Sequence, residues 1–210
     1  MPELITPLPT ERVGALAHRI ASVETLPSDG EDLLLAELVP PGMIALRGVA
    51  GDERFVRSAG SVLDCVLPLG ANTVTSAQAV TVLWLGPDEW LIVTAPGAET
   101  AMIARLRTAL DGVFSAVVDV TGNRARLRLS GARARDVLAK GMSLDLHPRA
   151  FKPGRCAQST LARAGVLLHQ LDEAPTYDLY PRRSFATYVH AWLLDAMTEY
   201  GGRAYPAPAA

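Results

Sequence analysis

The chain has 210 residues, of which 49% are hydrophobic and 20% are charged, enough apolar material for one large domain or two small interlocked ones. Its formal net charge of −2 provides no overall field that would attract nucleic acid or an anionic membrane surface. No run approaches the roughly 18 apolar residues that a membrane-spanning helix needs, so a transmembrane protein is not expected.

Residues 1–40 are predicted to form an N-terminal arm, because prolines at positions 2, 7, 9 and 27 interrupt any regular structure there. Within the arm, 10–20 could form a short helix with Thr10 as its N-cap. The arm could lie on a partner, pack on its own domain or be disordered, and the sequence favours none of these outcomes.

Residues 41–200 are predicted to form a single bilobal α+β domain, with a first half at about 41–120. The elements expected in this half are a strand (43–49), an amphipathic helix (52–66), a loop (67–76), two hairpin strands (80–85 and 89–94), a helix (98–110) and a strand (113–120). This β-α-β-β-α-β order is that of the ferredoxin-like split unit.

The hairpin is the clearest element of the first half. Two apolar strands flank a four-residue turn at 86–89, and Trp84 and Trp90 occur near the turn on opposite strands. We expect the two indoles to pack on one face of the hairpin as part of the core. The alternative is an aromatic platform for a ligand, which no polar residue inside the hairpin supports.

The second half, at about 121–200, repeats a similar order. It is expected to contain a strand (124–130), a helix (131–140), an irregular connection (141–155), three strands (156–163, 166–171 and 176–180) and a final helix (185–200) capped by Ser184. Residues 201–210 are predicted to be a loose tail. The fold class is therefore α+β, with two interlocked ferredoxin-like βαββαβ halves that share one core.

Candidate catalytic groups are sparse. The four histidines (18, 147, 169 and 190) show no metal-ligand spacing, and the chain contains no P-loop, dinucleotide fingerprint or nucleophile elbow. Cys156 follows Arg155 and lies near Lys152, which could activate a thiol, but it also begins an apolar strand, so a structural role is favoured. Cys65 is expected in the core. Two cysteines without a CxxC pair fit a reducing cytoplasm, the compartment we expect.

Basic residues gather in the second half of the chain. Residues 1–111 carry 14 acidic and 7 basic side chains, whereas 112–210 carry 8 and 13. We predict a partner interface formed by five arginines on one strand and the helix that follows it: Arg124, Arg126, Arg128, Arg133 and Arg135. The alternatives are a solvated sheet face that protects an edge, a site for a polyglutamate-like anion, and an RNA-binding surface, which the lack of interleaved aromatics disfavours. Replacing Arg126 and Arg128 by Ser should leave the fold intact and weaken assembly.

Several segments resemble the gamma subunit of heterotetrameric sarcosine oxidase over roughly residues 40–200. They are Leu-Trp-Leu-Gly-Pro-Asp-Glu-Trp-Leu (83–91), Asp-Val-Thr-Gly (119–122) leading into Arg-Leu-Arg-Leu-Ser-Gly (126–131), Leu-Asp-Leu-His (144–147), Phe-Lys-Pro-Gly (151–154) and Tyr-Asp-Leu-Tyr-Pro-Arg (177–182) with Ser184. The combination is more specific than any one of these motifs alone.

The resemblance implies a fold similar to the folate-binding core of glycine-cleavage aminomethyltransferases. Those proteins carry a paired-acid stretch shortly before the segment that matches 85–93, whereas 71–82 contains no Asp or Glu here. The Lys-Gly-Cys-Tyr-type motif of related iron–sulfur-assembly proteins is only loosely echoed at 152–158, with no aromatic after Cys156. An independent folate or redox role is therefore not expected.

The resemblance also implies a subunit with no catalytic, cofactor-binding or metal site of its own. In that family's complex, FAD, FMN, NAD and tetrahydrofolate belong to partner subunits, and the gamma chain joins alpha, beta and delta chains, chiefly alpha. The complex oxidatively demethylates sarcosine to glycine, with hydrogen peroxide and, when tetrahydrofolate is present, methylenetetrahydrofolate as products. The alternative is a stand-alone folate-binding protein of the aminomethyltransferase type.

Overall fold

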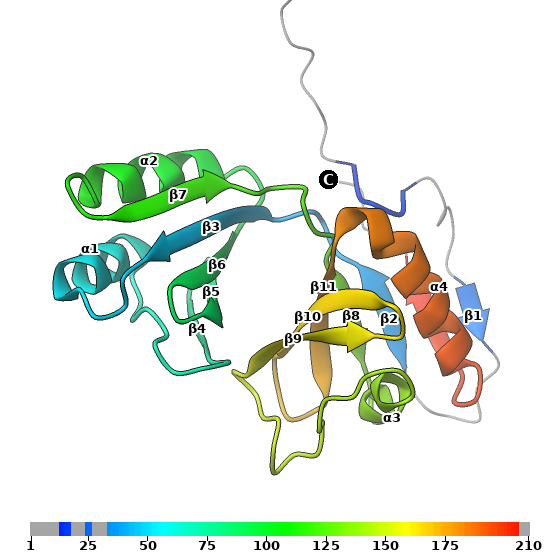
Figure 1. Ribbon diagram of the computed structural model, residues 1–210. Coiled ribbons are helices and arrows are strands. Elements are labelled where there is room, and N and C mark those ends of the chain that lie inside the picture. The colour runs from blue at the N-terminus through cyan, green and yellow to red at the C-terminus, as the bar shows by residue number, and fades with distance from the viewer. Residues whose placement is uncertain (1–12, 18–23, 27–32, 206–210) are drawn as a thin grey trace, which may run out of the picture.

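Two β-sheets stand face to face, and each carries helices on its outer side (Figure 1). The computed structural model describes residues 13–17, 24–26 and 33–205. The α+β prediction with paired ferredoxin-like units is confirmed. One sheet draws its strands from within the predicted first half, whereas the other also takes strands at 24–26, 34–37 and 202–205, outside the predicted second half.

The first half forms a five-stranded antiparallel sheet in the order β4-β5-β6-β3-β7. Its strands are β3 (Gly42–Gly48), β4 (Val74–Ala77), β5 (Val80–Gly86), β6 (Glu89–Thr94) and β7 (Ser115–Asp119). Two helices, α1 (Glu53–Leu63) and α2 (Glu99–Ala109), cover its outer face. The order of β5, β6, β3 and β7 is the one expected for a ferredoxin-like unit. The edge strand β4 lies mostly in the predicted loop 67–76, and this loop prediction was wrong from Val74 onward.

The first-half elements follow local sequence signals. Asp52 is the N-cap of α1, and its carboxylate accepts hydrogen bonds from the amides of Arg54 and Phe55. Phe55 and Leu63 lie on the same buried face of that helix. Periodicity and capping residues thus agree on where the helix begins and which side enters the core.

The hairpin of β5 and β6 is a core element, as predicted. Trp84 and Trp90 are direct cross-strand partners, and both pack in the cluster beneath α1 and α2. Trp90 is fully buried, its Nε1 donates a 2.7 Å hydrogen bond to the carbonyl of Pro68, and its ring centroid lies 5.6 Å from that of Phe55. The buried indole has a partner for its one polar atom, which makes its burial favourable.

The second sheet has seven strands in the order β1-β12-β2-β8-β11-β10-β9 and combines strands of the second half with strands from both ends of the described chain. Its strands are β1 (Glu24–Leu26), β2 (Leu34–Glu37), β8 (Leu127–Ser130), β9 (Cys156–Leu161), β10 (Ala164–Gln170), β11 (Thr176–Pro181) and β12 (Gly202–Tyr205). Helices α3 (Ala134–Ala139) and α4 (Ala186–Met197) cover its outer face. Among the described strands of this sheet, β12 and β2 pair in parallel and all other neighbours are antiparallel.

The two sheets repeat one arrangement, with one strand inserted. Reading β9-β10-β11-β8 against β4-β5-β6-β3 gives the same order, and β12 then takes the place that β7 has in the first half. The inserted strand is β2, which separates β12 from β8. The structure therefore shows the internal repeat in the spatial order of the strands. The sequence shows it only in the order of helices and strands along the chain.

The predicted arm and tail require correction at their inner ends. Leu33 and Leu35 are fully buried, so this part of residues 1–40 packs on its own domain. Gly202–Tyr205 is a strand and not a loose tail, because it pairs on both sides within the sheet. Gly202 adopts φ +129°, and a Cβ there would lie 2.5 Å from the carbonyl oxygen of Leu33, so only glycine allows this close approach. Thr10, the predicted N-cap, lies outside the described residues.

The start of α4 also differs from the prediction. A 3₁₀ turn, η1 (Arg183–Phe185), precedes the helix, and Phe185 is the N-cap without a side-chain hydrogen bond. Ser184 lies inside this turn and does not cap the helix.

Substituting Trp90 tests the hairpin as a core element. Trp90→Ala should lower the free energy of unfolding by about 3–5 kcal/mol, because a fully buried indole leaves a cavity and an unpaired carbonyl at Pro68. Trp84→Ala is the matched control on the facing strand, and a smaller loss is expected because Trp84 is only partly buried. Denaturant unfolding measures both, and equal small losses would contradict a core role for Trp90.

Candidate functional site

The space between the two sheets is the first place to look for a site, because both inner faces meet there. Seven buried residues from both sheets fill its centre: Met43, Leu83, Leu91, Val93, Cys156, Leu167 and Tyr180. These residues alternate with others that face the outer helices, as the period of two in a strand requires. The centre is therefore an apolar contact, and polar groups gather at its margin.

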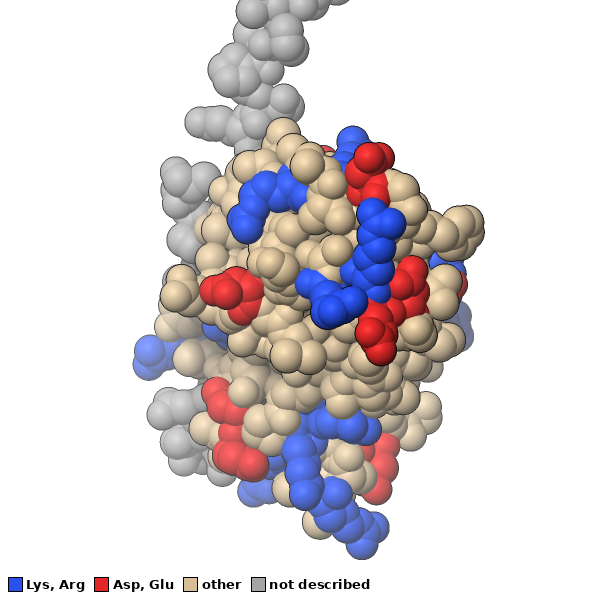
Figure 2. All heavy atoms as spheres, turned by 90° about the vertical axis from the view of Figure 1, so that its left-hand side faces the viewer, with Lys and Arg blue, Asp and Glu red and all other residues tan. Residues whose placement is uncertain are grey.

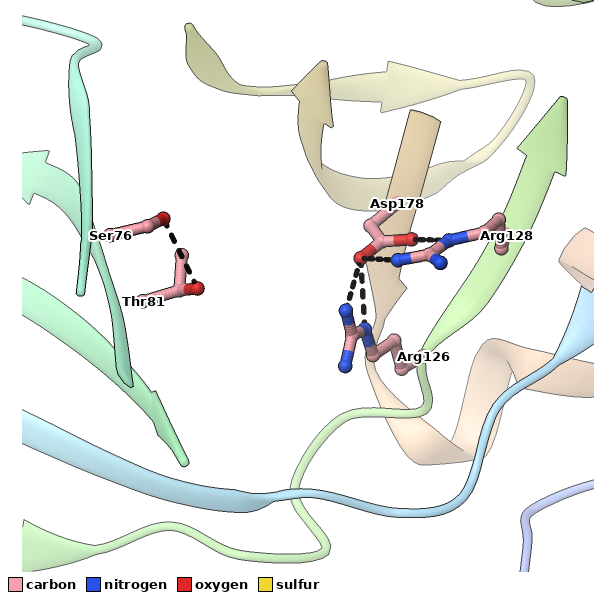
Figure 3. Close-up of polar contacts among 5 residues, drawn as sticks. All are labelled: Ser76, Thr81, Arg126, Arg128 and Asp178. Atoms are coloured by element: carbon pink, nitrogen blue, oxygen red, sulfur yellow. Dashed lines mark hydrogen bonds and ion pairs between the residues drawn. The ribbon is translucent and has the colours of Figure 1, made fainter. Parts of the chain in front are cut away.

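A charged cluster at this margin is built around Asp178 of β11 (Figure 3). The carboxylate is fully buried. Arg126 donates from Nε and Nη2 to Oδ2, at 2.9 and 2.6 Å. Arg128 donates from Nε to Oδ1 at 2.7 Å and from Nη2 to Oδ2 at 3.0 Å. Two charge-assisted forks thus satisfy one buried carboxylate.

The cluster follows from strand register. Asp178 is the direct cross-strand partner of Arg128 on one side and of His169 on the other. Arg126 and Arg128 alternate with Leu127 and Leu129, so the arginines share the face that looks toward the first sheet (Figure 3). The prediction that Arg126 and Arg128 lie on one side of a strand is correct. Their partner Asp178 could not be predicted from the pattern, because it lies about 50 positions further along the chain.

Two further polar groups on this face are kept neutral by burial. Burial lowers the pKa of His169 to about 4; Arg126 and Arg128 act in the same direction, and Asp178 opposes them. Burial also raises the pKa of the Tyr180 hydroxyl above its ordinary value, with Asp178 adding to the effect. An imidazole and a phenol in these states serve packing and hydrogen bonding better than proton transfer near pH 7.

A cleft of about 340 Å³ opens beside the cluster. Its walls come from the β2–β3 connection, from β5 and β6 with the residues around them, and from Arg126: Leu38, Val39, Pro41, Gln78, Ala79, Thr81, Val93, Thr94, Ala95, Pro96 and Arg126. None of these lining residues is an acid, a histidine or a cysteine. Arg126, the one charged group among them, already binds Asp178. The lining contributes the hydroxyls of Thr81 and Thr94 and lacks an acid–base pair.

The five predicted interface arginines do not form one surface. Arg126 and Arg128 face the other sheet and are engaged by Asp178. Arg133 and Arg135 lie at α3, which covers the opposite face of the sheet. Arg124 stands apart, beside Arg182. The structure thus divides the group into three environments, and contact with a partner remains a prediction for each.

The three arginines outside the Asp178 cluster each have their own neighbours. Arg133 pairs with the exposed carboxylate of Asp136. Arg135 lies beside Tyr177, where burial raises the pKa of the hydroxyl and the arginine opposes that shift. Arg124 donates 2.9 Å to the carbonyl of Tyr180. Sequence periodicity could not separate these positions, because the strand ends and a helix crosses the other face directly after it.

Cys156 has the environment of a structural thiol. It is fully buried, and its Sγ lies 3.4 Å from the carbonyl oxygen of Trp84 and 3.6 Å from that of Thr73. Burial raises its pKa to about 11, so the reactive thiolate is scarce at neutral pH. Cys65 is only half-buried, and burial raises the pKa of its thiol as well.

Other site types find no support in the described part of the chain. No group of three or more His, Cys, Asp or Glu side chains among those residues could hold a metal ion. Within the described ranges, no helix combines the length and apolar character of a membrane span. On the face at the side of α1 and α2, basic and acidic side chains are interspersed (Figure 2), unlike the single-sign patch typical of nucleic-acid binding.

Comparison with known proteins identifies the family. The profile of the sarcosine oxidase gamma subunit family matches residues 47–199. The chain is 38% identical to a sarcosine oxidase subunit gamma from Corynebacterium sp. (strain P-1), over 88% of this chain and 89% of that one. A subunit gamma from an Arthrobacter species is 37% identical over the same shares. The chain belongs to the sarcosine oxidase gamma subunit family.

Two solved structures have folds similar to that of this chain. A chain of the heterotetrameric sarcosine oxidase from Corynebacterium sp. U-96, a complex with pyrrole 2-carboxylate, matches with TM-score 0.82 and 33% identity over 90% of this chain and 96% of that one. The glycine cleavage system aminomethyltransferase T from Bartonella henselae matches with TM-score 0.61 and 15% identity over 84% of this chain and 48% of that one. The second likeness shows a shared fold and no more.

In this gamma-family chain, the acid-free segment 71–82 contributes Gln78, Ala79 and Thr81 to the cleft. Thr81 lines this cleft together with Arg126, and its hydroxyl lies 3.3 Å from that of Ser76 (Figure 3). This segment therefore brings only neutral side chains to the cleft.

The structure changes the expected effect of removing Arg126 and Arg128. Replacing both by Ser should lower the free energy of unfolding by about 3–5 kcal/mol, because Asp178 would remain buried without its cations. Arg47→Ser is the control, since Arg47 and Asp88 form an ion pair of similar length, 2.8 Å, that is largely exposed. Its unfolding midpoint should hardly change. Equal effects in denaturant unfolding would show that Asp178 does not need its arginines.

The neutral His169 predicts a pH dependence of stability. Its folded pKa of about 4 lies below the ordinary 6.5, so in this window the unfolded chain binds the extra proton. The free energy of unfolding should therefore fall by up to about 3 kcal/mol as pH decreases from about 6.5 to about 4. Denaturant unfolding at several pH values measures this, and His169→Asn should have a shallower slope. The same slope in both proteins would exclude His169 as the cause.

Proposed function

We propose that this chain is the gamma subunit of a heterotetrameric sarcosine oxidase and contributes structure to that complex without supplying catalytic groups. The observation that carries the proposal is the family membership, with 38% identity to a sarcosine oxidase subunit gamma over most of both chains. The match to a chain of a heterotetrameric sarcosine oxidase supports assembly with other subunits.

The proposed partners are the alpha, beta and delta subunits, chiefly alpha, with FAD, FMN, NAD and tetrahydrofolate bound on those partners. The complex would demethylate sarcosine to glycine, forming hydrogen peroxide and, with tetrahydrofolate, methylenetetrahydrofolate. The chemistry of the cleft supports this division of labour, because its lining offers no carboxylate or histidine for proton transfer. Two free cysteines agree with assembly in the reducing cytoplasm.

The stand-alone folate-binding alternative is less well supported. It requires a carboxylate to orient the pterin or the amine, and the segment that would carry it contains none. The predicted partner contacts at Arg124, Arg126, Arg128, Arg133 and Arg135 remain part of the proposal. Of these, Arg126 and Arg128 also form ion pairs with Asp178 inside the chain.

The proposal is tested by purifying a tagged chain from cells that express it with its partner subunits. The chain should co-purify with a flavin absorption spectrum and with sarcosine-dependent hydrogen peroxide formation. The chain purified alone should be colourless and inactive. Sarcosine oxidation by the isolated chain, or absence of flavin from the co-purified material, would refute the proposal, and micromolar tetrahydrofolate binding in calorimetry would favour the alternative.

A further inference from the structure

Arg124 and Arg182 form a pair of cations at the surface, away from the Asp178 cluster. Their backbones are bridge partners, and their side chains line two adjoining cavities of about 90 and 230 Å³. The smaller cavity extends toward the hairpin and Glu89. The larger one extends along β9 and β10 to Phe185. Both guanidinium groups therefore belong to one hollowed area of the surface.

Neutral groups hold the two arginines in place. Arg124 donates from Nη1 to the carbonyl of Tyr180 at 2.9 Å, and Arg182 donates from Nη1 to Oδ1 of Asn123 at 2.7 Å. Each uses one N–H in this way and keeps others for a ligand. Among the ion pairs within the described ranges, none includes either arginine.

The electrostatics of the pair favour an added negative charge. Burial lowers the pKa of Arg124, and the neighbouring charge of Arg182 lowers it further, with only Glu89 acting in the opposite direction. Arg126 and Arg128, on the same strand region, show what such a pair does when an acid is near: both bind Asp178 at 2.6–3.0 Å. Arg124 and Arg182 have the same chemistry, and the acid nearest to them in the smaller cavity, Glu89, forms no ion pair with either among the described residues.

An exposed aromatic ring adjoins the cations. Phe185 is 45% exposed and lines the larger cavity together with Arg124 and Arg182. Arginine beside an aromatic side chain is the composition typical of the residues that carry binding energy in protein interfaces. A small free anion would satisfy the arginines and leave the ring in water, whereas a protein segment would cover both.

We propose that Arg124 and Arg182 bind a carboxylate side chain of a partner subunit, with Phe185 packing against an apolar residue next to that acid. The inference rests on the proposed function, because the occupant is a subunit of the same complex. It concerns one member of the predicted five-arginine interface, Arg124, and adds two residues outside that interface prediction, Arg182 and Phe185.

The test uses the tagged chain co-expressed with its partner subunits, and measures subunit dissociation at several salt concentrations. Arg182→Gln should weaken association by at least about tenfold at low salt, because a charge-assisted contact at an interface is lost. The salt dependence should become shallower at the same time. Arg182→Lys should restore part of the affinity, and Phe185→Ala should weaken association at all salt concentrations.

Arg149→Gln serves as the matched control, since this exposed arginine lies on the connection to β9, away from the two cavities. All variants should melt like the wild type, because Arg182 and Phe185 are exposed. If the wild-type complex forms and Arg182→Gln binds as tightly, the inference is wrong while the proposed function stands. That result, together with a citrate-dependent rise in wild-type melting temperature, would assign the pair to a small anion. Failure of the wild-type chain to associate would overturn both.

Discussion

The apolar contact between the inner faces of the two sheets is the constraint on which the rest of the structure depends. It joins β3, β5 and β6 to β9, β10 and β11 through buried aliphatic side chains, Cys156 and Tyr180. Each strand there has one face toward the other sheet and one toward the helices, so inner positions favour apolar, paired or neutral groups. Asp178 is paired with two arginines, Cys156 stays a thiol, and His169 stays neutral although its buried Nδ1 has no hydrogen-bond partner among the described residues.

The same constraint explains the character of the cleft. Where the sheets separate, the wall is made of aliphatic residues, two threonines and a glutamine, and the single cation is committed to Asp178. Catalytic acids and bases need a pKa near the working pH and access to a substrate. His169 has neither, since it is buried and its pKa is lowered to about 4. Within the described residues, the ionisable groups on this inner face are paired with one another or held neutral.

Much of the first half could be predicted from the sequence, because its signals are local. The period of α1, the cap at Asp52 and the turn of the hairpin lie within a few residues of the structure they specify. The failures at β4 and Ser184 were local, but those at β2 and β12 depend on distant pairing. β2 and β12 pair across about 170 positions, and Gly202 is required by the backbone of Leu33, which its own neighbours do not reveal. The strand β12 has only four residues, between Gly201 and Pro206, which is too short for an alternating hydrophobic pattern to be recognised.

The arginines show the same contrast between local sequence signals and distant pairing. Their alternation placed Arg126 and Arg128 on one face, but a strand pattern cannot tell whether that face meets water, a partner or another sheet. The answer came from the register of β8 with β11, which sets Arg128 opposite Asp178 and leaves Arg124 next to Arg182 beyond the end of the strand. Positions two residues apart therefore have opposite roles. Arg126 neutralises an internal acid, whereas Arg124 bonds to the carbonyl of Tyr180 beside Arg182 and is the residue that we propose to bind a carboxylate from outside the chain.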